Sequence, residues 1–544
     1  MNKINKAFKT VLLLLALLPS CVRFNENTSE SDSKAGGETS NTVAGDFAVK
    51  ELFFDDGTPL VEVVGNVYNY TVKIPAGHPR IPRISVEPSA ETEITYRQAV
   101  IPADGTRGTG TVTLNNGIES VCYSVVFEKD PSLGLVYQYD DRIDFSVDDE
   151  DIIYESSDTS VAVVDSHGTV TIVGIGDSGA VVTARKGSDI VSKLTIDKTV
   201  RAPLNVFFVT GQSNAEGTMG TARDSVKPCA GTAYVMTNQN NSIGSLENGY
   251  PGFGSSIAAS WFEMTGEKSL MVQTAVSGSS VSLWVKGGAY YVRTVQKMNY
   301  IREMFSGEES GYEINRVACF WLQGEFDIGN HMSSEEYYVK FLKMYNGFKK
   351  DLGMTFLAVI PVRCYDKDPD ILPESLETGL MTDMVPVRAA QYAVQSAYND
   401  IFFVTRLPES ATVANGMMSP DNLHYCQSGY NKLGHDIADN LFDYLCGLGI
   451  DCETSLQVLG YDGRKCYADC DTLALSPSQT VQIVGVVLPF YANDKSVSYK
   501  SSDASVFSVD AFGLITVCED TAGKEAELFI SGGGHTIVLN ISVS

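Results

Sequence analysis

The sequence predicts a multidomain protein in which a central three-layer α/β domain with a parallel sheet is flanked by all-β sandwiches. The chain has 544 residues, too many for a single hydrophobic core. Between residues 201 and 449, apolar strand-like runs alternate with helical stretches, which is typical of a parallel sheet covered by helices on both faces. On either side, short alternating runs punctuated by Gly, Pro and Asn indicate β-sandwiches.

The composition is that of a folded, acidic protein. Hydrophobic residues make up 44% of the chain and charged residues 20%, and 40 basic against 67 acidic residues leave a net charge of −27. Such a charge argues against nucleic acid or anionic lipid headgroups as partners, because few cations are present to neutralise phosphates.

The N-terminus has the features of a targeting segment. Three lysines within the first nine residues precede an apolar run, 11–18, that is too short to span a bilayer. Leu18-Pro19-Ser20-Cys21 follows and resembles the lipobox of bacterial lipoproteins, in which the cysteine is lipidated. An ordinary signal peptide with a chance cysteine is the alternative. We therefore expect a signal peptide over 1–21, a polar disordered tether over 22–45, and a chain that is exported and lipid-anchored to the bacterial outer membrane or cell surface.

Four of the 11 cysteines cluster at the end of the central region and just past it. They could pair in an oxidising compartment, but their connectivity does not follow from sequence. A zinc site is disfavoured, because neither spacing is Cys-x2-Cys and no histidine is nearby. We therefore expect no metal and no cofactor. The four are Cys446, Cys452, Cys466 and Cys470.

The flanking regions are expected to be three β-sandwiches, over 46–130, 131–200 and 450–544. The last two repeat each other, because Tyr154–Val161 returns as Tyr499–Val506 and the register continues without a gap. The shared Ser-Ser-Asp and Val-Asp-x-x-Gly patterns resemble bacterial immunoglobulin-like group 2 domains. That resemblance implies spacer or adhesion modules, and the polar motif residues are interpreted as turn formers at hairpin corners.

The central region is expected to contain five buried strands, each followed by a helix. Right-handed crossovers would make the sheet parallel, and sites in such sheets form beyond the carboxyl ends of the strands. The strands are expected at 205–209, 270–275, 316–321, 355–362 and 401–404, and the helices at 256–265, 291–305, 334–352, 385–398 and 428–445.

Four polar segments follow the carboxyl ends of these strands and can therefore converge. The first strand leads into Gly211-Gln212-Ser213-Asn214, and the second into Ser277-Gly278-Ser279. Trp321-Leu322-Gln323-Gly324-Glu325-Phe326-Asp327 ends the third strand, and Asp421-Asn422-Leu423-His424 precedes the last helix.

These motifs resemble the SGNH-hydrolase superfamily, and most closely its sialate O-acetylesterase and acetylxylan esterase branch. That branch is marked by Gly-Gln-Ser-Asn, Trp-x-Gln-Gly-Glu-x-Asp and a late Asp-x-x-His, which occur here in the same order over 201–449. The resemblance implies a flavodoxin-like SGNH domain. Two segments depart from the family: Ala215-Glu216-Gly217 stands where Met-Ala-Gly is common, and Ser277-Gly278-Ser279 where many relatives carry paired glycines.

The candidate catalytic residues are Ser213, His424 and Asp421. A serine hydroxyl needs a base within hydrogen-bond reach, and an imidazole with a pKa near ~6.5 can accept and return its proton. Asp421 can orient that imidazole, or it caps the turn before the last helix. Glu325 is a possible alternative acid. Of the other histidines in this region, His435 lies inside the last predicted helix and is expected to be a core or surface residue, and His331 could line the cleft.

The resemblance implies three oxyanion donors: the backbone N–H of Ser213, the backbone N–H of Gly278 and the side-chain amide of Gln323. A glycine at 278 also lets the backbone approach a substrate. Asn214 is expected to fix the turn by Asx bonding, and Trp284 is either a core residue or a platform for a sugar.

The candidate triad predicts a metal-independent serine esterase, and the family resemblance implies that it removes O-acetyl groups from an acetylated glycan. Sialic acid, xylan and other glycans are not separated, because the substrate loops, about 219–252 and 364–384, carry no diagnostic pattern. A non-catalytic surface glycan-binding or adhesion lipoprotein is the competing class, and a peptidase or lipase with the same triad is a lesser alternative.

Overall fold

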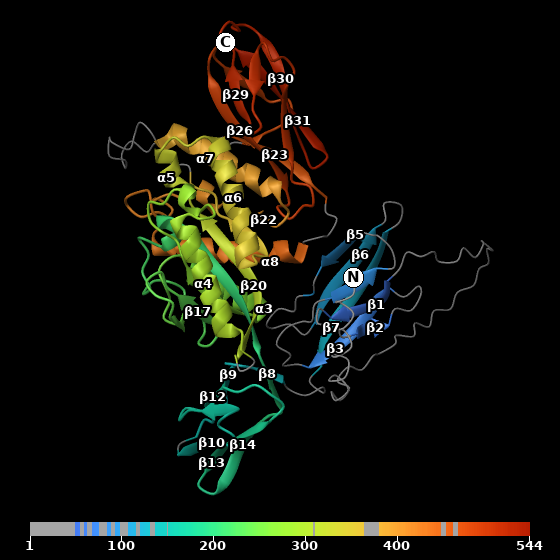
Figure 1. Ribbon diagram of the computed structural model, residues 1–544, viewed down its shortest axis with the longest axis vertical. Coiled ribbons are helices and arrows are strands. Elements are labelled where there is room, and N and C mark those ends of the chain that lie inside the picture. The colour runs from blue at the N-terminus through green and yellow to red at the C-terminus, as the bar shows by residue number, and fades with distance from the viewer. Residues whose placement is uncertain are drawn as a thin grey trace, which may run out of the picture. The chain divides into compact units, whose positions relative to one another are not determined.

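The computed structural model contains two compact units, Met1–Val200 and Arg201–Ser544, which are described separately (Figure 1). Residues 1–48, with the predicted signal peptide, Cys21 and the tether, lie outside the described residues. Among the residues that are described, no helix combines the length and apolar character needed to cross a membrane. The structure describes residues 49–54, 59–62, 68–75, 84–88, 93–97, 99, 107–115, 120–130, 136–149, 151–307, 310–363, 380–447, 453–460 and 466–544.

The first unit consists of β-strands around two separate hydrophobic cores. Its strands are β1 (Val49–Phe54), β2 (Pro59–Glu62), β3 (Asn69–Pro75), β4 (Ile84–Pro88), β5 (Glu93–Arg97), β6 (Arg107–Asn115), β7 (Ser120–Asp130), β8 (Val136–Gln138), β9 (Arg142–Asp144), β10 (Ile152–Ser156), β11 (Ala162–Val164), β12 (Thr169–Ile172), β13 (Ala180–Lys186), β14 (Asp189–Ile196) and β15 (Lys198–Val200). The sheets have the orders β2-β1-β4 and β3-β7-β6-β5, then β10-β13-β14, β11-β12-β9 and β15-β8.

The second unit is built on a seven-stranded sheet with the order β18-β17-β19-β16-β20-β21-β22. All pairs are parallel except β17 with β18, so the sheet is mixed and the prediction of a purely parallel sheet was wrong at this edge. The five expected strands are present; β17 and β18 are additional and lie in a segment predicted as loop. The bounds are β16 (Ala202–Gly211), β17 (Ala233–Met236), β18 (Ile243–Ser245), β19 (Lys268–Gln273), β20 (Tyr312–Leu322), β21 (Phe356–Val359) and β22 (Ile401–Phe403).

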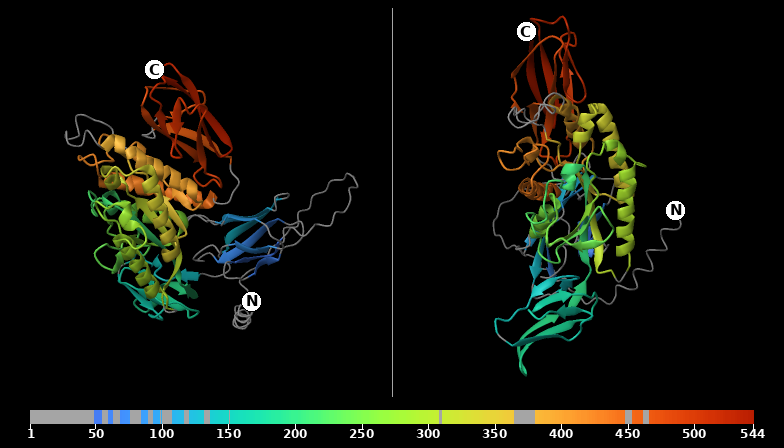
Figure 2. Two further views of the ribbon diagram at one scale, coloured as in Figure 1. Left: turned by 45° about the horizontal axis from the view of Figure 1, so that its top comes forward. Right: turned by 90° about the vertical axis from the view of Figure 1, so that its left-hand side faces the viewer.

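The five expected helices are present and form two groups (Figure 2). One group pairs α3 (Gly254–Thr265) with α8 (Gln427–Gly447), and the other packs α6 (Ser334–Leu352) against α4 (Ala289–Phe305) and α7 (Leu380–Ala397). Four shorter elements are α2 (Ser213–Glu216), α5 (Glu325–Gly329) and the 3₁₀ helices η2 (Val281–Trp284) and η4 (Leu407–Glu409).

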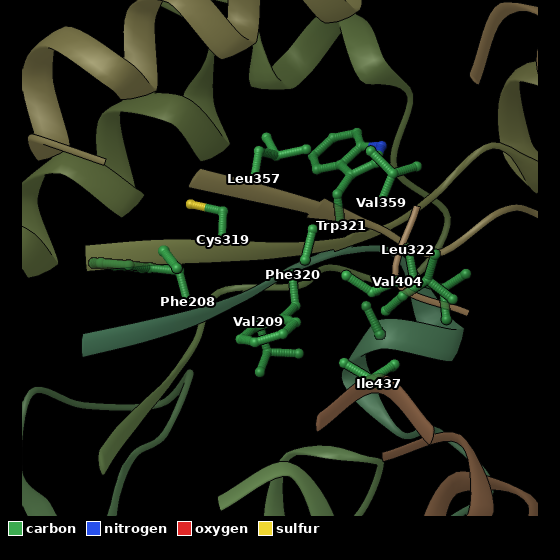
Figure 3. Close-up of a cluster of buried hydrophobic side chains, with 14 of the residues drawn as sticks. Phe208, Val209, Cys319, Phe320, Trp321, Leu322, Leu357, Val359, Val404 and Ile437 are labelled. Carbon is green, nitrogen blue, oxygen red and sulfur yellow. The ribbon is translucent and has the colours of Figure 1, made fainter. Parts of the chain in front are cut away.

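Strands β16, β19, β21 and β22 are buried on both faces, because successive side chains point to opposite helix layers. Figure 3 shows Val209 and Phe320 on the side of Ile437 from α8, whereas Trp321 points the other way. There Trp321 packs edge-on against Phe341 of α6, with ring centroids 5.9 Å apart. This layering gives the predicted three-layer α/β architecture.

The remaining chain forms two further sheets with a core of their own, coloured red in Figure 1. Their strands are β23 (Ser455–Gly460), β24 (Cys466–Tyr467), β25 (Thr472–Leu475), β26 (Thr480–Leu488), β27 (Val497–Ser501), β28 (Phe507–Val509), β29 (Leu514–Val517), β30 (Glu525–Gly532) and β31 (His535–Val543). The sheet orders are β24-β23-β26-β29-β28 and β25-β31-β30-β27. Cys466 and Cys470 form no disulfide, and Cys446 and Cys452 lie outside the residues whose side chains are described.

This C-terminal β region packs directly on the α/β domain. The buried ring of Phe490 lies 5.9 Å from Phe403 of β22 and 6.0 Å from Tyr444 of α8. The ammonium group of Lys495, also buried, donates to the carbonyl of Ile401 at 2.8 Å. That burial lowers the pKa of Lys495 to about 8. The region is therefore an integral part of the second unit rather than a detached spacer.

The internal repeat forms the same turns in both copies. Asp158 Oδ1 accepts the N–H two residues ahead at 2.9 Å, and Asp503 Oδ1 does the same at 2.8 Å. Asp165 and Asp510 each accept the N–H groups two and four residues ahead. The interpretation of these residues as turn formers is confirmed. The immunoglobulin-like assignment of the sandwiches stays a prediction.

Candidate active site

The candidate nucleophile stands where the central strand of the sheet turns sharply into a helix. β16 ends at Gly211, whose φ is 127°, and α2 begins two residues later at Ser213. A Cβ atom at Gly211 would lie 2.0 Å from the carbonyl oxygen of Leu322, so no larger residue fits. The chain crosses to opposite sides of β16 to form β19 and β20, so Ser213 lies at the topological switch point of the sheet.

Ser213, His424 and Asp421 form a continuous hydrogen-bonded chain. Ser213 Oγ lies 3.0 Å from His424 Nε2, and His424 Nδ1 lies 2.7 Å from Asp421 Oδ2. The three predicted residues are therefore brought together from segments 211 positions apart. A base next to a serine hydroxyl, with a carboxylate on its second nitrogen, is the arrangement that activates serine for nucleophilic attack.

The Asp421 carboxylate is held in its ionised form. Partial burial by itself raises its pKa, but hydrogen bonds from the N–H of His424, the Ser419 hydroxyl, the His424 ring and the N–H of Leu423 outweigh that effect. Together they lower the pKa of Asp421 to about 2. Oδ1 accepts the bond from the Ser419 hydroxyl and the two bonds from the N–H groups of Leu423 and His424, of which the latter two are each 3.0 Å long. Oδ2 accepts the bond from the imidazole Nδ1. Asp421 therefore both orders its own loop, as a turn cap would, and orients His424.

A buried arginine supports the same loop and was not found from the sequence. Arg363 follows β21 and donates to the carbonyl oxygens of Ala411 and Asn422, at 2.6 and 2.7 Å. It also donates to Asn422 Oδ1 at 2.9 Å. Asn422 lies between the acid and the base and has a φ of 50°, and the arginine holds both its carbonyl and its side chain. An arginine directly after the fourth predicted strand was the available signal, since that position lies at the site edge of the sheet.

The alternative acid, Glu325, is hydrogen-bonded to Asn214 instead of His424. Asn214 Nδ2 donates to Glu325 Oε1 at 2.8 Å and to the carbonyl of Leu423 at 3.2 Å, while its Oδ1 accepts the N–H of Tyr425 at 3.2 Å. Burial raises the pKa of Glu325, against the lowering effects of Asn214 and the nearby His424. Asn214 thus joins the nucleophile turn to the His424 loop, and its predicted Asx bond within its own turn is not formed.

Two of the three expected oxyanion donors are available. No hydrogen bond within the described part of the chain uses the N–H of Ser213 or of Gly278. The third, the Gln323 amide, is fully buried and already donates to the carbonyl of Ser279 at 2.9 Å and to Asp327 Oδ2 at 2.7 Å. Because both of its amide protons have acceptors, Gln323 braces the site, and its predicted oxyanion role is not supported by this geometry.

A second amide and a carboxylate connect the segments around the site. Gln212 Oε1 accepts the N–H groups of Gly324 and Phe326 at 3.3 and 3.2 Å, which links the nucleophile turn to the end of β20. Asp327 Oδ2 also accepts the N–H of Val281 at 2.8 Å, which links α5 to η2. The motif residues around Ser213 therefore act largely as braces between loops.

The remaining candidates lie outside the triad. His435 is exposed on α8, as one of its two expected placements had it, and its Nδ1 lies 2.6 Å from the Ser260 hydroxyl of α3. His331 is exposed and has a φ of 55°. Trp284 is completely buried, with its ring 5.5 Å from that of Trp321, and is therefore a core residue.

The sheet topology together with the Ser213–His424–Asp421 chain defines the class of serine hydrolase sites. Residues 203–443 match the family of carbohydrate esterases described as sialic acid-specific acetylesterases. The match covers most of the α/β domain, leaves out the flanking β regions and supports carbohydrate esterase activity for this stretch.

Several solved structures show distant likeness to the chain, whereas no curated protein sequence matches it. A carbohydrate acetylesterase from Xanthomonas citri is 11% identical with a TM-score of 0.35, covering 75% of this chain and 96% of its own. A protein from Arabidopsis thaliana is 18% identical with a TM-score of 0.33, over 45% of this chain and 100% of its own. A psychrotrophic esterase from Pseudoalteromonas sp. is 8% identical with a TM-score of 0.26, over 44% and 98%.

Proposed function

We propose that this protein is a serine esterase that removes O-acetyl groups from carbohydrates through an acyl-enzyme intermediate. The observation that carries the proposal is the chain from Ser213 Oγ to His424 Nε2, at 3.0 Å, and from His424 Nδ1 to Asp421 Oδ2, at 2.7 Å. The acetylated sugar is inferred from the family match over residues 203–443.

In the proposed reaction, Ser213 Oγ attacks the acetyl carbonyl carbon while His424 Nε2 takes the hydroxyl proton. The carbonyl oxygen becomes an oxyanion, which the N–H groups of Ser213 and Gly278 stabilise. The C–O bond to the sugar then breaks, and the sugar oxygen receives the proton from His424. Water attacks the acetyl-serine with His424 as base, which releases acetate and restores the Ser213 hydroxyl. Asp421 remains ionised throughout and stabilises the imidazolium.

The proposal includes a location outside the cytoplasm. The lipobox-like segment that ends at Cys21 and the polar stretch 22–45 would tether the folded units to a membrane surface. An esterase held there would meet glycans from outside the cell, and its two N-terminal β regions would act as spacers or sugar-binding modules.

The test is release of p-nitrophenol from p-nitrophenyl acetate by the full chain and by Ser213→Ala and His424→Ala. Each substitution is expected to lower kcat by roughly 10⁵-fold or more, because nucleophile and base act as a unit. His435→Ala is the matched control, since this histidine bonds Ser260 between two helices, and it should keep its activity.

Acetylated xylan and O-acetylated sialic acid come next as substrates. A folded chain with no activity above that of Ser213→Ala would contradict the esterase proposal. It would favour the alternative of a surface glycan-binding protein.

A further inference from the structure

Glu216 and Ser277, one from each of the two segments that depart from the family's motifs, are bonded to each other. Glu216 Oε2 accepts the Ser277 hydroxyl at 2.6 Å and the Ser277 backbone N–H at 2.9 Å. Alanine, the common family residue at position 216, has no carboxylate for such a bond, and a glycine at 277 would have no hydroxyl. The two departures therefore form one interaction rather than two independent changes.

This pair joins the nucleophile turn to the loop that carries an oxyanion donor. Glu216 is the last residue of α2, which begins at Ser213, and Ser277 immediately precedes Gly278. Thr218 adds to the link, because its Oγ1 donates to the carbonyl of Ser213 at 3.1 Å and lies 3.2 Å from Ser277 Oγ. The position of Gly278 relative to Ser213 thus depends on these side chains.

Gly278 itself has little to hold it in place. Its φ is 65°, and a Cβ atom built on it would meet nothing within 4 Å. The loop is anchored at its two ends on the carbonyl of Gly211, by the Val276 N–H at 2.9 Å and by the Ser279 hydroxyl at 3.3 Å. Between these anchors, the two bonds from Ser277 to Glu216 are the ones that the described residues provide, because the single hydroxyl proton of Thr218 goes to the carbonyl of Ser213.

We propose that Glu216 is a positioning residue, which holds Ser277 and thereby aims the Gly278 N–H at the oxyanion of the transition state. The inference rests on the proposed esterase function. Glu216 Oε2 accepts two bonds, which hold both the backbone N–H and the side chain of Ser277. Together with the Ser279 anchor on the other side, they limit the orientations of the planar peptide unit that carries the Gly278 N–H. A donor aimed in advance needs no reorganisation when the negative charge develops.

The test compares the wild-type full chain with Glu216→Ala, Glu216→Gln, Ser277→Ala and the Glu216→Ala/Ser277→Ala double variant. Asp224→Asn is the matched control, because the exposed Asp224 carboxylate also accepts a threonine hydroxyl but contacts Thr221 and Arg223 instead of the Gly278 loop. Steady-state kinetics on p-nitrophenyl acetate give kcat and KM. Inhibition by methylboronic acid, whose tetrahedral serine adduct presents an oxygen to the oxyanion donors, gives Ki.

We expect Glu216→Ala to lower kcat by roughly tenfold, less than the loss of a whole oxyanion donor, with KM changed less than about twofold. Ki for methylboronic acid should rise by the same factor. Glu216→Gln should keep most of the activity, because its amide oxygen can still accept both bonds. The double variant should be no worse than Glu216→Ala, because both substitutions remove the same interaction.

The Ki measurement separates positioning from a merely structural role, since unfolding part of the sample lowers kcat but leaves Ki unchanged. Unchanged kcat in Glu216→Ala, unchanged Ki, or additive losses in the double variant would each overturn the inference. An inactive wild-type chain would instead refute the esterase proposal, whereas activity that depends on Ser213 but not on Glu216 refutes the inference alone.

Discussion

The Asp421→Asn substitution tests whether Asp421 or Glu325 is the carboxylate that orients His424, and the structure predicts that it leaves the rest of the loop in place. Asp421 Oδ1 accepts the Ser419 hydroxyl and the N–H groups of Leu423 and His424, so these three donors keep the Asn oxygen at the Oδ1 position. The Asn NH₂ group must then occupy the Oδ2 position, 2.7 Å from His424 Nδ1. The loop geometry is retained and only the bond to the ring changes.

The size of the expected loss in kcat follows from the histidine tautomer that the Asp421→Asn substitution imposes. An NH₂ group facing Nδ1 makes that nitrogen an acceptor, which places the ring proton on Nε2, the atom that must accept the proton of Ser213. Loss of the correct tautomer lowers kcat by about 10³- to 10⁴-fold in triad enzymes, or about 4–5.5 kcal/mol at 1.36 kcal/mol per tenfold. We expect a loss in that range for Asp421→Asn, with thermal unfolding checked on the same sample.

Glu325→Gln is the companion variant. Its amide oxygen can still accept the bond from Asn214, which lies 2.8 Å from Glu325 Oε1, so we expect less than a tenfold loss in kcat. Initial rates of p-nitrophenyl acetate hydrolysis between pH 5 and 9 would measure both. The assignment is refuted if Glu325→Gln costs three orders of magnitude while Asp421→Asn costs less than tenfold.

Three further outcomes are expected. Because hydrogen bonds lower the pKa of Asp421 to about 2, its contribution to stability should be fully present above about pH 4 and lost as the pH falls through about 2. Acid unfolding of Asp421→Asn should therefore lack the loss of stability that comes from protonating this carboxylate. Identical acid-unfolding profiles of the two proteins would contradict this expectation. Arg363→Lys should lower kcat about 10- to 100-fold, because a single ammonium group cannot replace the forked guanidinium that bonds both the carbonyl and the side chain of Asn422. An unchanged kcat would show that the His424 loop does not need this arginine. Phe490→Ala should lower the free energy of unfolding of the second unit by about 3–5 kcal/mol, because it removes a buried aromatic ring; denaturant titration measures this. A change below about 1 kcal/mol would mean that the C-terminal β region packs only loosely on the α/β domain.

Convergence of the catalytic segments could be predicted from chain order alone. Parallel strands joined by helices bring their carboxyl ends to one edge, so motifs following the first and fifth predicted strands had to approach each other. Ser213 and His424 lie 3.0 Å apart for that reason, although 211 positions separate them. The short strand β17 could not be predicted in the same way, because the segment around it was interpreted as a substrate loop and its pairing with β19 decides its conformation.

The roles of individual side chains within the site were harder to predict from the sequence, because side chains of distant segments compete for the same hydrogen-bond partners. Gln323 is present as the family resemblance requires, yet Ser279 and Asp327 take both of its amide protons. Trp284 could have been a core residue or a sugar platform until its burial against Trp321 was known.

The sequence by itself determined the order of the elements, the internal repeat with its aspartate turns, and the residue types of the triad, since these depend on local periodicity and on neighbours within a few positions. Tertiary structure alone decided that Asp421 rather than Glu325 reaches His424, that Arg363 supports their loop, that Glu216 binds Ser277, and that the C-terminal β region docks through Phe490. Hydrogen bonds and packing contacts form over a few ångströms, so their partners are settled only when the fold brings distant segments to that range.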